Sequence, residues 1–159
     1  MLPIASDAQI LPFRTYSIEN GLSESVANDM LQDADGYIWV ATGYGLNRFD
    51  GHNFRNYFEE NGLLNNKIQS LYQDREGRLW IGTNGGVNVI EGDSIRTREV
   101  LNPLRRSTIL EIIEDSQGEY WFATDGQGVW HLDGAGQLTQ YSTVHGLVND
   151  RVRDIIEDE

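Results

Sequence analysis

The stretch from Gln73 to Val87 reads QDREGRLWIGTNGGV, and its framework occurs three times in the chain. An earlier copy spans 32–46 and a later one spans 115–129, and both keep the aspartate, glycine, tryptophan and threonine in the same order. The tryptophans of the three copies are 41 residues apart: Trp39, Trp80 and Trp121. Such a period predicts an architecture built from similar units, before any local structure is considered.

The tryptophan segment of each copy has the alternation of a β-strand. In residues 78–83, Leu79 and Ile81 point to one side of the strand, and Trp80 and Gly82 point to the other. The residue two positions after each tryptophan is small: Ala41, Gly82 and Ala123. A large ring beside a small residue lets a neighbouring sheet pack closely against the strand.

The apolar segment before each tryptophan is ambiguous by spacing alone. Ile68, Leu71 and Tyr72 are spaced as on one face of a helix. Only about seven residues separate the flanking turns, however, and an isolated helix of that length is marginal. We therefore predict strands that are buried between two neighbouring sheets and so are apolar on both faces.

The turns of the repeat have recognisable chemistry. Asp33 and Gly36 hold the first and fourth positions of a turn in the first copy, which is the signature of a type I turn. The other two copies have the same pair at 74–77 and 115–118. Glycines at 43 and 45, 85 and 86, and 126 and 128 mark the next turn, where positive φ angles are expected.

Four short strands per 41 residues predict one antiparallel blade per repeat, and hence an all-β propeller over residues 1–159. A linear solenoid of the same units is the alternative. The expected parts are an edge strand at 13–17, blades at about 26–58, 68–99 and 109–142, and the first strand of another blade at 152–157. This amounts to about three and a half blades of a seven-bladed ring, and bare faces at both ends predict self-association.

The string Asp-x-x-Gly-x-x-Trp-x-(Gly/Ala)-Thr-x-x-Gly-(Leu/Val) resembles the two-component regulator propeller repeat. It begins at Asp33, Asp74 and Asp115, and the third copy has one extra residue before Gly128 and Val129. The spacing from Phe13 to the Gly-Leu pair at 21–22 is similar to the opening of such sensors.

This resemblance implies a periplasmic sensor region of an inner-membrane receptor of the hybrid two-component histidine kinase type, binding a small ligand such as an oligosaccharide. Relatives with a diguanylate cyclase output are the alternative. Complete sensors of this family are similar to two seven-bladed propellers in series, followed by an immunoglobulin-like domain. The resemblance therefore places this chain in the first half of the first ring.

Composition limits the partners and the chemistry. The chain has 159 residues with 12 basic and 25 acidic side chains, a net charge of -13, so nucleic acid is not expected as a partner. It has no cysteine, which excludes disulfides and thiolate sites. No apolar run approaches the roughly 20 residues of a membrane span, so contact with a membrane is expected only through segments further along a longer chain.

No catalytic, metal or cofactor site is predicted. His52, His131 and His145 do not lie at metal-ligand spacings. The acidic turn that begins at Asp33 lacks the remaining ligands of a calcium loop. A lyase on a propeller scaffold is thus the least supported of three classes, behind a ligand sensor and a protein-interaction scaffold.

The repeat breaks at residues 95–108, and this break predicts the binding site. Four of the 12 basic residues lie there, and Pro103 replaces the glycine of the Gly-Leu turn. On an acidic body, a local arginine cluster can attract an anionic ligand, although a solvated edge strand is the simpler explanation. The predicted ligand-binding residues, all on one face of the propeller, are Lys67, Asn84, Arg105, Arg106, Asp125, Gln127 and Arg151.

Overall fold

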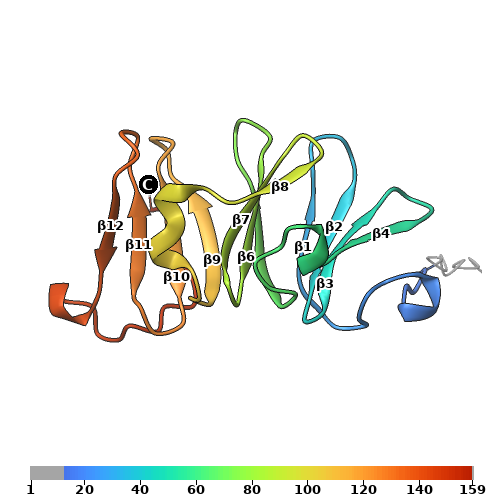
Figure 1. The fold of residues 1–159 in the computed structure, drawn as a ribbon, viewed down its shortest axis with the longest axis horizontal. Helices are drawn as coiled ribbons and strands as arrows, with labels where there is room; N and C mark the ends of the chain where they lie inside the picture. The colour runs from blue at the N-terminus through green and yellow to red at the C-terminus, as the bar shows by residue number, and fades with distance from the viewer. Residues whose placement is uncertain (1–12, 159) are drawn as a thin grey trace, which may run out of the picture.

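The computed structural model describes residues 13–158 and forms three four-stranded antiparallel sheets (Figure 1). The first blade contains β1 (Ala27–Gln32), β2 (Ile38–Thr42), β3 (Gly45–Phe49) and β4 (Phe54–Tyr57). The second contains β5 (Ile68–Gln73), β6 (Leu79–Thr83), β7 (Gly86–Glu91) and β8 (Ser94–Arg96). The third contains β9 (Ile109–Glu114), β10 (Tyr120–Thr124), β11 (Val129–Leu132) and β12 (Leu138–Tyr141).

Short 3-10 helices lie between these blades and at both ends of the described chain. They are η1 (Ile18–Asn20), η2 (Glu59–Asn61), η3 (Glu99–Leu104) and η4 (Thr143–His145). In η1, η2 and η4 a glycine in the left-handed region ends the helix, at Gly21, Gly62 and Gly146. The third blade is entered through η3 instead, which contains Pro103.

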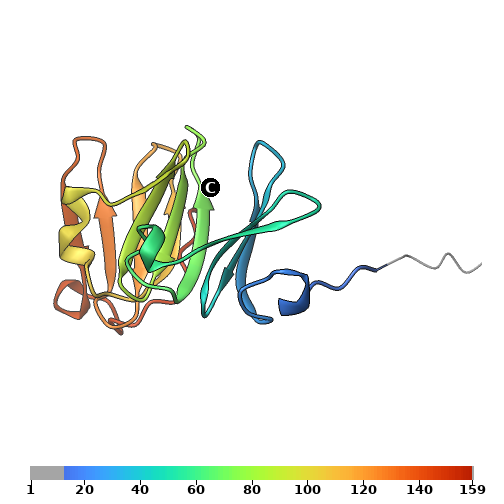
Figure 2. The same cartoon turned by 45° about the vertical axis from the view of Figure 1, so that its right-hand side comes forward.

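The blades radiate from their inner strands. Within each sheet the strands pair in chain order, and β5 lies against both β1 and β9. Close backbone approach between blades is concentrated at these inner strands, while the outer strands diverge, as the turned view in Figure 2 shows. The prediction of propeller blades, and not of a helix or a linear solenoid, is confirmed for these three units. The buried apolar inner strand is confirmed for β5 and β9, whereas β1 has no buried residue.

Two predicted strands at the ends of the chain are wrong. Residues 13–17 are extended but form no strand, and Tyr16 packs its ring on Phe49 and Phe54. Residues 152–157 also form no strand, although Arg151 makes an isolated bridge with Asp125. In both places the pairing partner of the predicted strand is missing from the described residues, and a lone strand has no ladder to stabilise it.

The turn aspartate has a second role that the sequence reading missed. In each blade its Oδ1 accepts backbone N–H groups of its own turn, and its Oδ2 accepts the indole N–H of the tryptophan six residues later. The N···O distances are 2.7, 2.7 and 2.8 Å for Asp33–Trp39, Asp74–Trp80 and Asp115–Trp121. The aspartate thus fixes both the hairpin and the ring that packs against the next blade.

The core lies between the blades, in two seams. In the first seam Trp39 packs with Leu79 and Ile81 of the second blade. In the second seam, between the second and third blades, Trp80 packs with Tyr120 and Phe122. A Cβ at Gly82 would lie 2.3 Å from the Ser70 Oγ and 3.0 Å from the Ile109 carbonyl oxygen, so the small residue is required by close approach of the strands.

Polar contacts join successive blades at equivalent positions. A side chain at the end of an inner strand accepts the backbone N–H that follows the turn aspartate of the preceding blade. The three bonds are from Ala34 to Gln73, from Arg75 to Glu114, and from Ser116 to Glu157. Residues near the end of the chain therefore keep the position of an inner strand although they form no strand.

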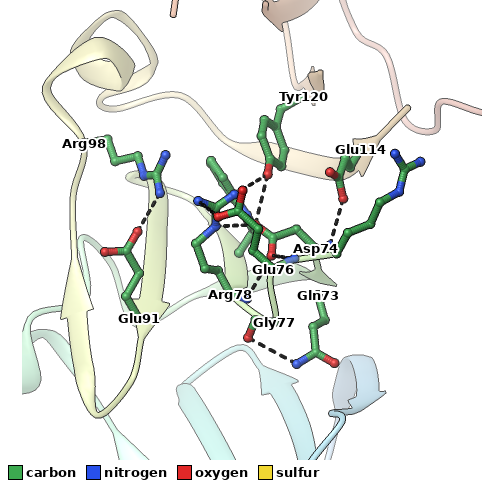
Figure 3. A network of polar contacts seen from close by, with 11 residues as sticks. Gln73, Asp74, Glu76, Gly77, Arg78, Glu91, Arg98, Glu114 and Tyr120 are labelled. Carbon is green, nitrogen blue, oxygen red and sulfur yellow. Dashed lines mark hydrogen bonds and ion pairs between the residues drawn. The ribbon is translucent and has the colours of Figure 1, made fainter. Parts of the chain in front are cut away.

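The second seam also contains a buried polar network (Figure 3). The Asp74 Oδ2 accepts from Arg78 Nε at 2.6 Å, from Trp80 Nε1 at 2.7 Å and from the Tyr120 hydroxyl at 3.0 Å. Burial of Asp74 raises its pKa, but these hydrogen bonds outweigh burial and hold the pKa below 3.8. Burial, together with the hydrogen bond to Asp74 and its charge, raises the pKa of Tyr120 to about 12.

Candidate functional site

The segment that replaces the Gly-Leu turn is anchored by two buried leucines. Leu101 and Leu104 are 4% and 0% exposed and belong to the core of the second seam. The 3-10 helix that they anchor ends at Leu104 and is capped by Arg105, whose backbone N–H donates to the Asn102 carbonyl. The break in the repeat therefore has two parts: the exposed edge strand β8, as in the alternative reading, and a packed entry segment that presents two exposed arginines.

Arg106 is held in an unusual backbone conformation. Its φ of 69° makes it the one non-glycine residue with a positive φ among residues 13–158. Its N–H donates to the Gly85 carbonyl at 3.0 Å, so the strained residue is tied to the turn between β6 and β7. A Cβ at Gly86 would lie 3.0 Å from the Leu104 carbonyl oxygen, which explains why that turn needs glycine.

A cavity of about 400 Å³ lies where these two segments meet. Its lining consists of Leu64, Asn65, Asn84, Gly85, Arg105 and Arg106. The Asn84 Oδ1 accepts from Gln69 Nε2 at 2.8 Å, which orients the amide. Neither arginine forms an ion pair within residues 13–158, so both guanidinium groups can bind an acceptor that enters from solvent.

The structure divides the predicted ligand-binding residues into groups. Asn84, Arg105 and Arg106 line the cavity together, and exposed Lys67 is joined to Asn84 by a backbone hydrogen bond. Gln127 accepts from the buried Ser107 hydroxyl at 2.9 Å, next to the arginine pair in sequence. Asp125 and Arg151 form an ion pair of their own at 2.9 Å, so these two neutralise each other.

The cavity has the chemistry for an anionic or hydroxyl-rich ligand. Two planar guanidinium groups can bind a carboxylate or sulfate bidentately, and the amides of Asn65 and Asn84 can donate to and accept from hydroxyls. The sequence singled out Arg105 and Arg106 because they lie at a break in the repeat, and the structure places both at this cavity. It did not single out Leu64 and Gly85, because they occupy ordinary repeat positions and line the cavity only through the path of the entry segment.

The comparisons with known proteins agree with the repeat and with the fold. Residues 21–44 and 62–85 match the two-component regulator propeller family. The third copy, with its lost glycine and extra residue, lies outside the matched segments. A 42-residue stretch is 48% identical to histidine kinase P4 of Formosa agariphila and covers 26% of this chain and 3% of that protein.

Two solved structures from B. thetaiotaomicron are similar over most of the chain. The extracellular domain of BT3049, assigned as a hybrid two-component system, has a TM-score of 0.77 and 28% identity over 89% of this chain. The extracellular domain of BT4673 has a TM-score of 0.71 and 26% identity over 81% of this chain. The chain spans 22% and 20% of those two structures, so it corresponds to a minor part of each.

The chain therefore carries repeats of the two-component regulator propeller family. Its three blades resemble the extracellular sensor propellers of hybrid two-component systems, in agreement with the resemblance drawn from the repeat. Between residues 13 and 158, no helix has the length and apolar character that crossing a membrane requires. The two similar structures are themselves extracellular domains.

Proposed function

We propose that this chain is a non-catalytic part of a periplasmic ligand sensor, and that it binds an acidic oligosaccharide at the cavity between Asn84, Arg105 and Arg106. The observation that carries the proposal is the arginine pair. Arg105 and Arg106 are exposed, lack ion-pair partners within the described residues and border a cavity of about 400 Å³ on a body with a net charge of -13. An acidic body that keeps two unpaired arginines beside amides is suited to an anionic ligand.

The test is binding of oligosaccharides to the purified chain by calorimetry. We expect uronic acid oligosaccharides to bind more tightly than neutral ones of the same length, and to bind more weakly as salt increases. Arg105→Ala combined with Arg106→Ala should weaken binding at least about tenfold, because two charge-assisted contacts are lost. Arg14→Ala combined with Arg153→Ala removes the same charge at exposed positions elsewhere and should leave the affinity unchanged.

Equal affinity of both double variants for the acidic ligand would contradict the proposed site. If the intact receptor is available, its output should lose the response to that ligand with the first pair and keep it with the second. The output of that receptor is proposed to be a histidine kinase, with a diguanylate cyclase as the alternative. A protein-interaction scaffold remains the second candidate, and the open edges of the end blades favour it.

We also propose that the chain, as it stands, associates with a second copy. Met30 and Ile38 are 65% and 38% exposed on the open face of the first blade. The open face of the third blade exposes Trp121 and Ile156 around a hollow of about 280 Å³. Between the blades of one chain, the equivalent faces are covered by the next blade. A second copy can cover an exposed face in the same way, by packing one of its own end blades against it.

Sedimentation velocity at tens of micromolar tests the association. We expect a species of at least two chains, and we expect Met30→Lys to shift it toward the monomer. A well-behaved wild-type monomer at that concentration would contradict the proposed self-association.

A further inference from the structure

Three potential metal ligands meet on the third blade, away from the arginine cavity. They are Asp115 and Glu119, on either side of the β9–β10 turn, and His131 on β11. One ligand atom from each lies within 4.8 Å of the other two. Asp115 is buried and the other two side chains are half-buried, so the cluster lies at the edge of the sheet core.

The fold holds each of these groups in place. His131 is paired with Trp121 across the β10–β11 ladder, and its ring stacks on the indole with centroids 3.9 Å apart. This stacking leaves His131 Nε2 at 2.8 Å from Glu119 Oε2. Asp115 is fixed by the Trp121 indole and by the backbone N–H groups of Gln117 and Glu119.

The equivalent positions of the second blade have no such set. The residue four positions after Asp74 is Arg78, which forms an ion pair with Asp74 at 2.6 Å. The residue opposite Trp80 on β7 is Val89, which is apolar. That blade therefore balances its buried carboxylate with a permanent cation.

The first blade also has an arginine near the equivalent position, at Arg48. Tyr37 takes the position of Glu119, and Arg48, the residue opposite Trp39, lies 4.4 Å from the Tyr37 ring. In the third blade, by contrast, two carboxylates and an imidazole lie close together at the equivalent position. Within residues 13–158 no lysine or arginine forms an ion pair with either carboxylate, and the Arg75 guanidinium donates to the backbone carbonyls of Asp115 and Ser116 instead.

We propose that Asp115, Glu119 and His131 form a binding site for a divalent transition-metal ion, with Zn²⁺ as the best match. One imidazole nitrogen and two carboxylate oxygens are a donor set that Zn²⁺ accepts, with a further position left for water or an outside ligand. The ion supplies the positive charge that Arg78 supplies in the second blade. It also links the β9–β10 turn to β11.

The geometry requires only local adjustment. Zinc bonds of about 2.0–2.2 Å place donor atoms about 3–3.5 Å apart, so a pair at the 4.8 Å limit must close by about 1.3–1.8 Å. Glu119 can provide that movement because it lies outside the strands and its side chain is half-buried. The Trp121 indole and the turn N–H groups are the outer contacts that hold Asp115 while it binds the ion.

Calorimetric titration of the chelator-treated chain with ZnCl₂ at neutral pH is the test. We expect one saturable site with a Kd of about 10 µM or tighter. Mg²⁺ should not compete, because it prefers oxygen donors in an octahedral arrangement. Zinc should also raise the melting temperature, since it binds only the folded arrangement of the three ligands.

Two variants each remove one of the proposed zinc ligands, and a third variant serves as the control. His131→Phe keeps a ring on Trp121 but removes the nitrogen donor, and Glu119→Gln removes a carboxylate at a half-buried position; each should weaken zinc binding at least about tenfold. His52→Gln changes an exposed histidine outside the cluster and should leave the Kd unchanged. Near-ultraviolet circular dichroism verifies that the variants fold.

Two results would overturn the site. One is the absence of saturable zinc binding by the wild-type chain up to millimolar concentration. The other is wild-type affinity in both His131→Phe and Glu119→Gln, which would assign the zinc to other surface groups. In the bound chain, the imidazole NMR signals of His131 should shift with zinc, while those of His52 should not.

Discussion

The two seams between the blades are built from the same sequence repeat, but their side chains pack differently. In both, a turn aspartate holds the indole of a tryptophan that packs against the next blade. The second seam is closed by Tyr120, which stacks on Trp80 at 4.2 Å and donates its hydroxyl to Asp74. Leu79 takes the position of Tyr120 in the first seam, where it offers no hydroxyl to Asp33.

A cavity of about 380 Å³ remains in the first seam as a result, beside Asp33, Tyr37 and Leu79. Arg78, the counterpart of Tyr37, fills the same place in the second seam and bonds both Asp74 and Tyr120 (Figure 3). The comparison shows that the repeat fixes the backbone and the Asp–Trp pair. Two or three variable positions then decide whether a seam is closed by a polar network or stays open.

Replacing the turn aspartate of each seam in turn should give the largest difference in unfolding free energy between the two seams. Asp74→Ala leaves Arg78, Trp80 and Tyr120 without their shared acceptor, and should lower the free energy of unfolding by about 3–5 kcal/mol. Asp33→Ala removes only the turn and indole bonds and should cost about 2 kcal/mol. Urea denaturation of the two variants measures both values. Equal losses would show that the polar network adds nothing to the second seam.

Alkaline pH should weaken the second seam selectively. The folded pKa of Tyr120 is raised to about 12 from 10.0, so the folded chain binds that proton more tightly than the unfolded chain. The stability from this group is complete below pH 10 and is lost as the pH rises toward 12. Tyr72, whose pKa is raised by burial and by Glu114, acts in the same sense.

Chemical denaturation of the wild type and of Tyr120→Phe between pH 8 and 12 separates the two tyrosines. The difference in unfolding free energy between the two proteins should shrink as pH rises. A constant difference would mean that Tyr120 titrates normally in the folded chain.

At neutral pH, Tyr120→Phe should have a smaller effect than loss of the aspartate. The ring and its stacking remain, while Arg78 loses a hydrogen bond of 2.7 Å and Asp74 loses one of 3.0 Å. We expect a loss of about 1–2 kcal/mol. The matched control is Tyr37→Phe, since the Tyr37 hydroxyl has no hydrogen bond to another described residue, and its effect should stay within about 0.5 kcal/mol. If both variants lost a similar amount of unfolding free energy, the loss in Tyr120→Phe could not be assigned to the hydrogen bonds of the polar network.

Much of the fold could be predicted from the sequence because the repeat is internally consistent. The tryptophan segment alternates, its neighbour at position 82 is small, and the Asp-to-Gly turns have a defined type, so each local feature agrees with a blade. The end strands at 13–17 and 152–157 were wrong for a different reason. Their sequences match strands, but a strand depends on a partner, which sequence similarity between repeats does not supply.

The site was less predictable because it depends on where the repeat is broken. Arg105 and Arg106 could be singled out from the missing Gly-Leu turn, yet nothing in the sequence indicated a 3-10 helix or the positive φ of Arg106. Asp125 and Arg151 are also predicted to bind a ligand, and nothing in the sequence indicated that they form an ion pair with each other. The cluster of Asp115, Glu119 and His131 was missed because the ladder register, not the sequence spacing, brings the histidine to the turn.

The smallest expected effect comes from converting the open seam into the closed form. Leu79→Tyr adds a ring at the wall of a cavity of about 380 Å³, within reach of the Trp39 indole and of Asp33. Because the cavity can take the added volume, we expect the free energy of unfolding to change by less than about 1 kcal/mol. The reverse change, Tyr120→Leu, should cost about 2–3 kcal/mol, since it removes the ring stacked on Trp80 and one hydrogen bond each from Arg78 and Asp74. The NMR signal of the Trp39 indole N–H, which donates to Asp33, should shift in Leu79→Tyr as its acceptor gains a second donor. A loss above about 2 kcal/mol would mean that backbone differences, and not the side chain at this position, keep the first seam open.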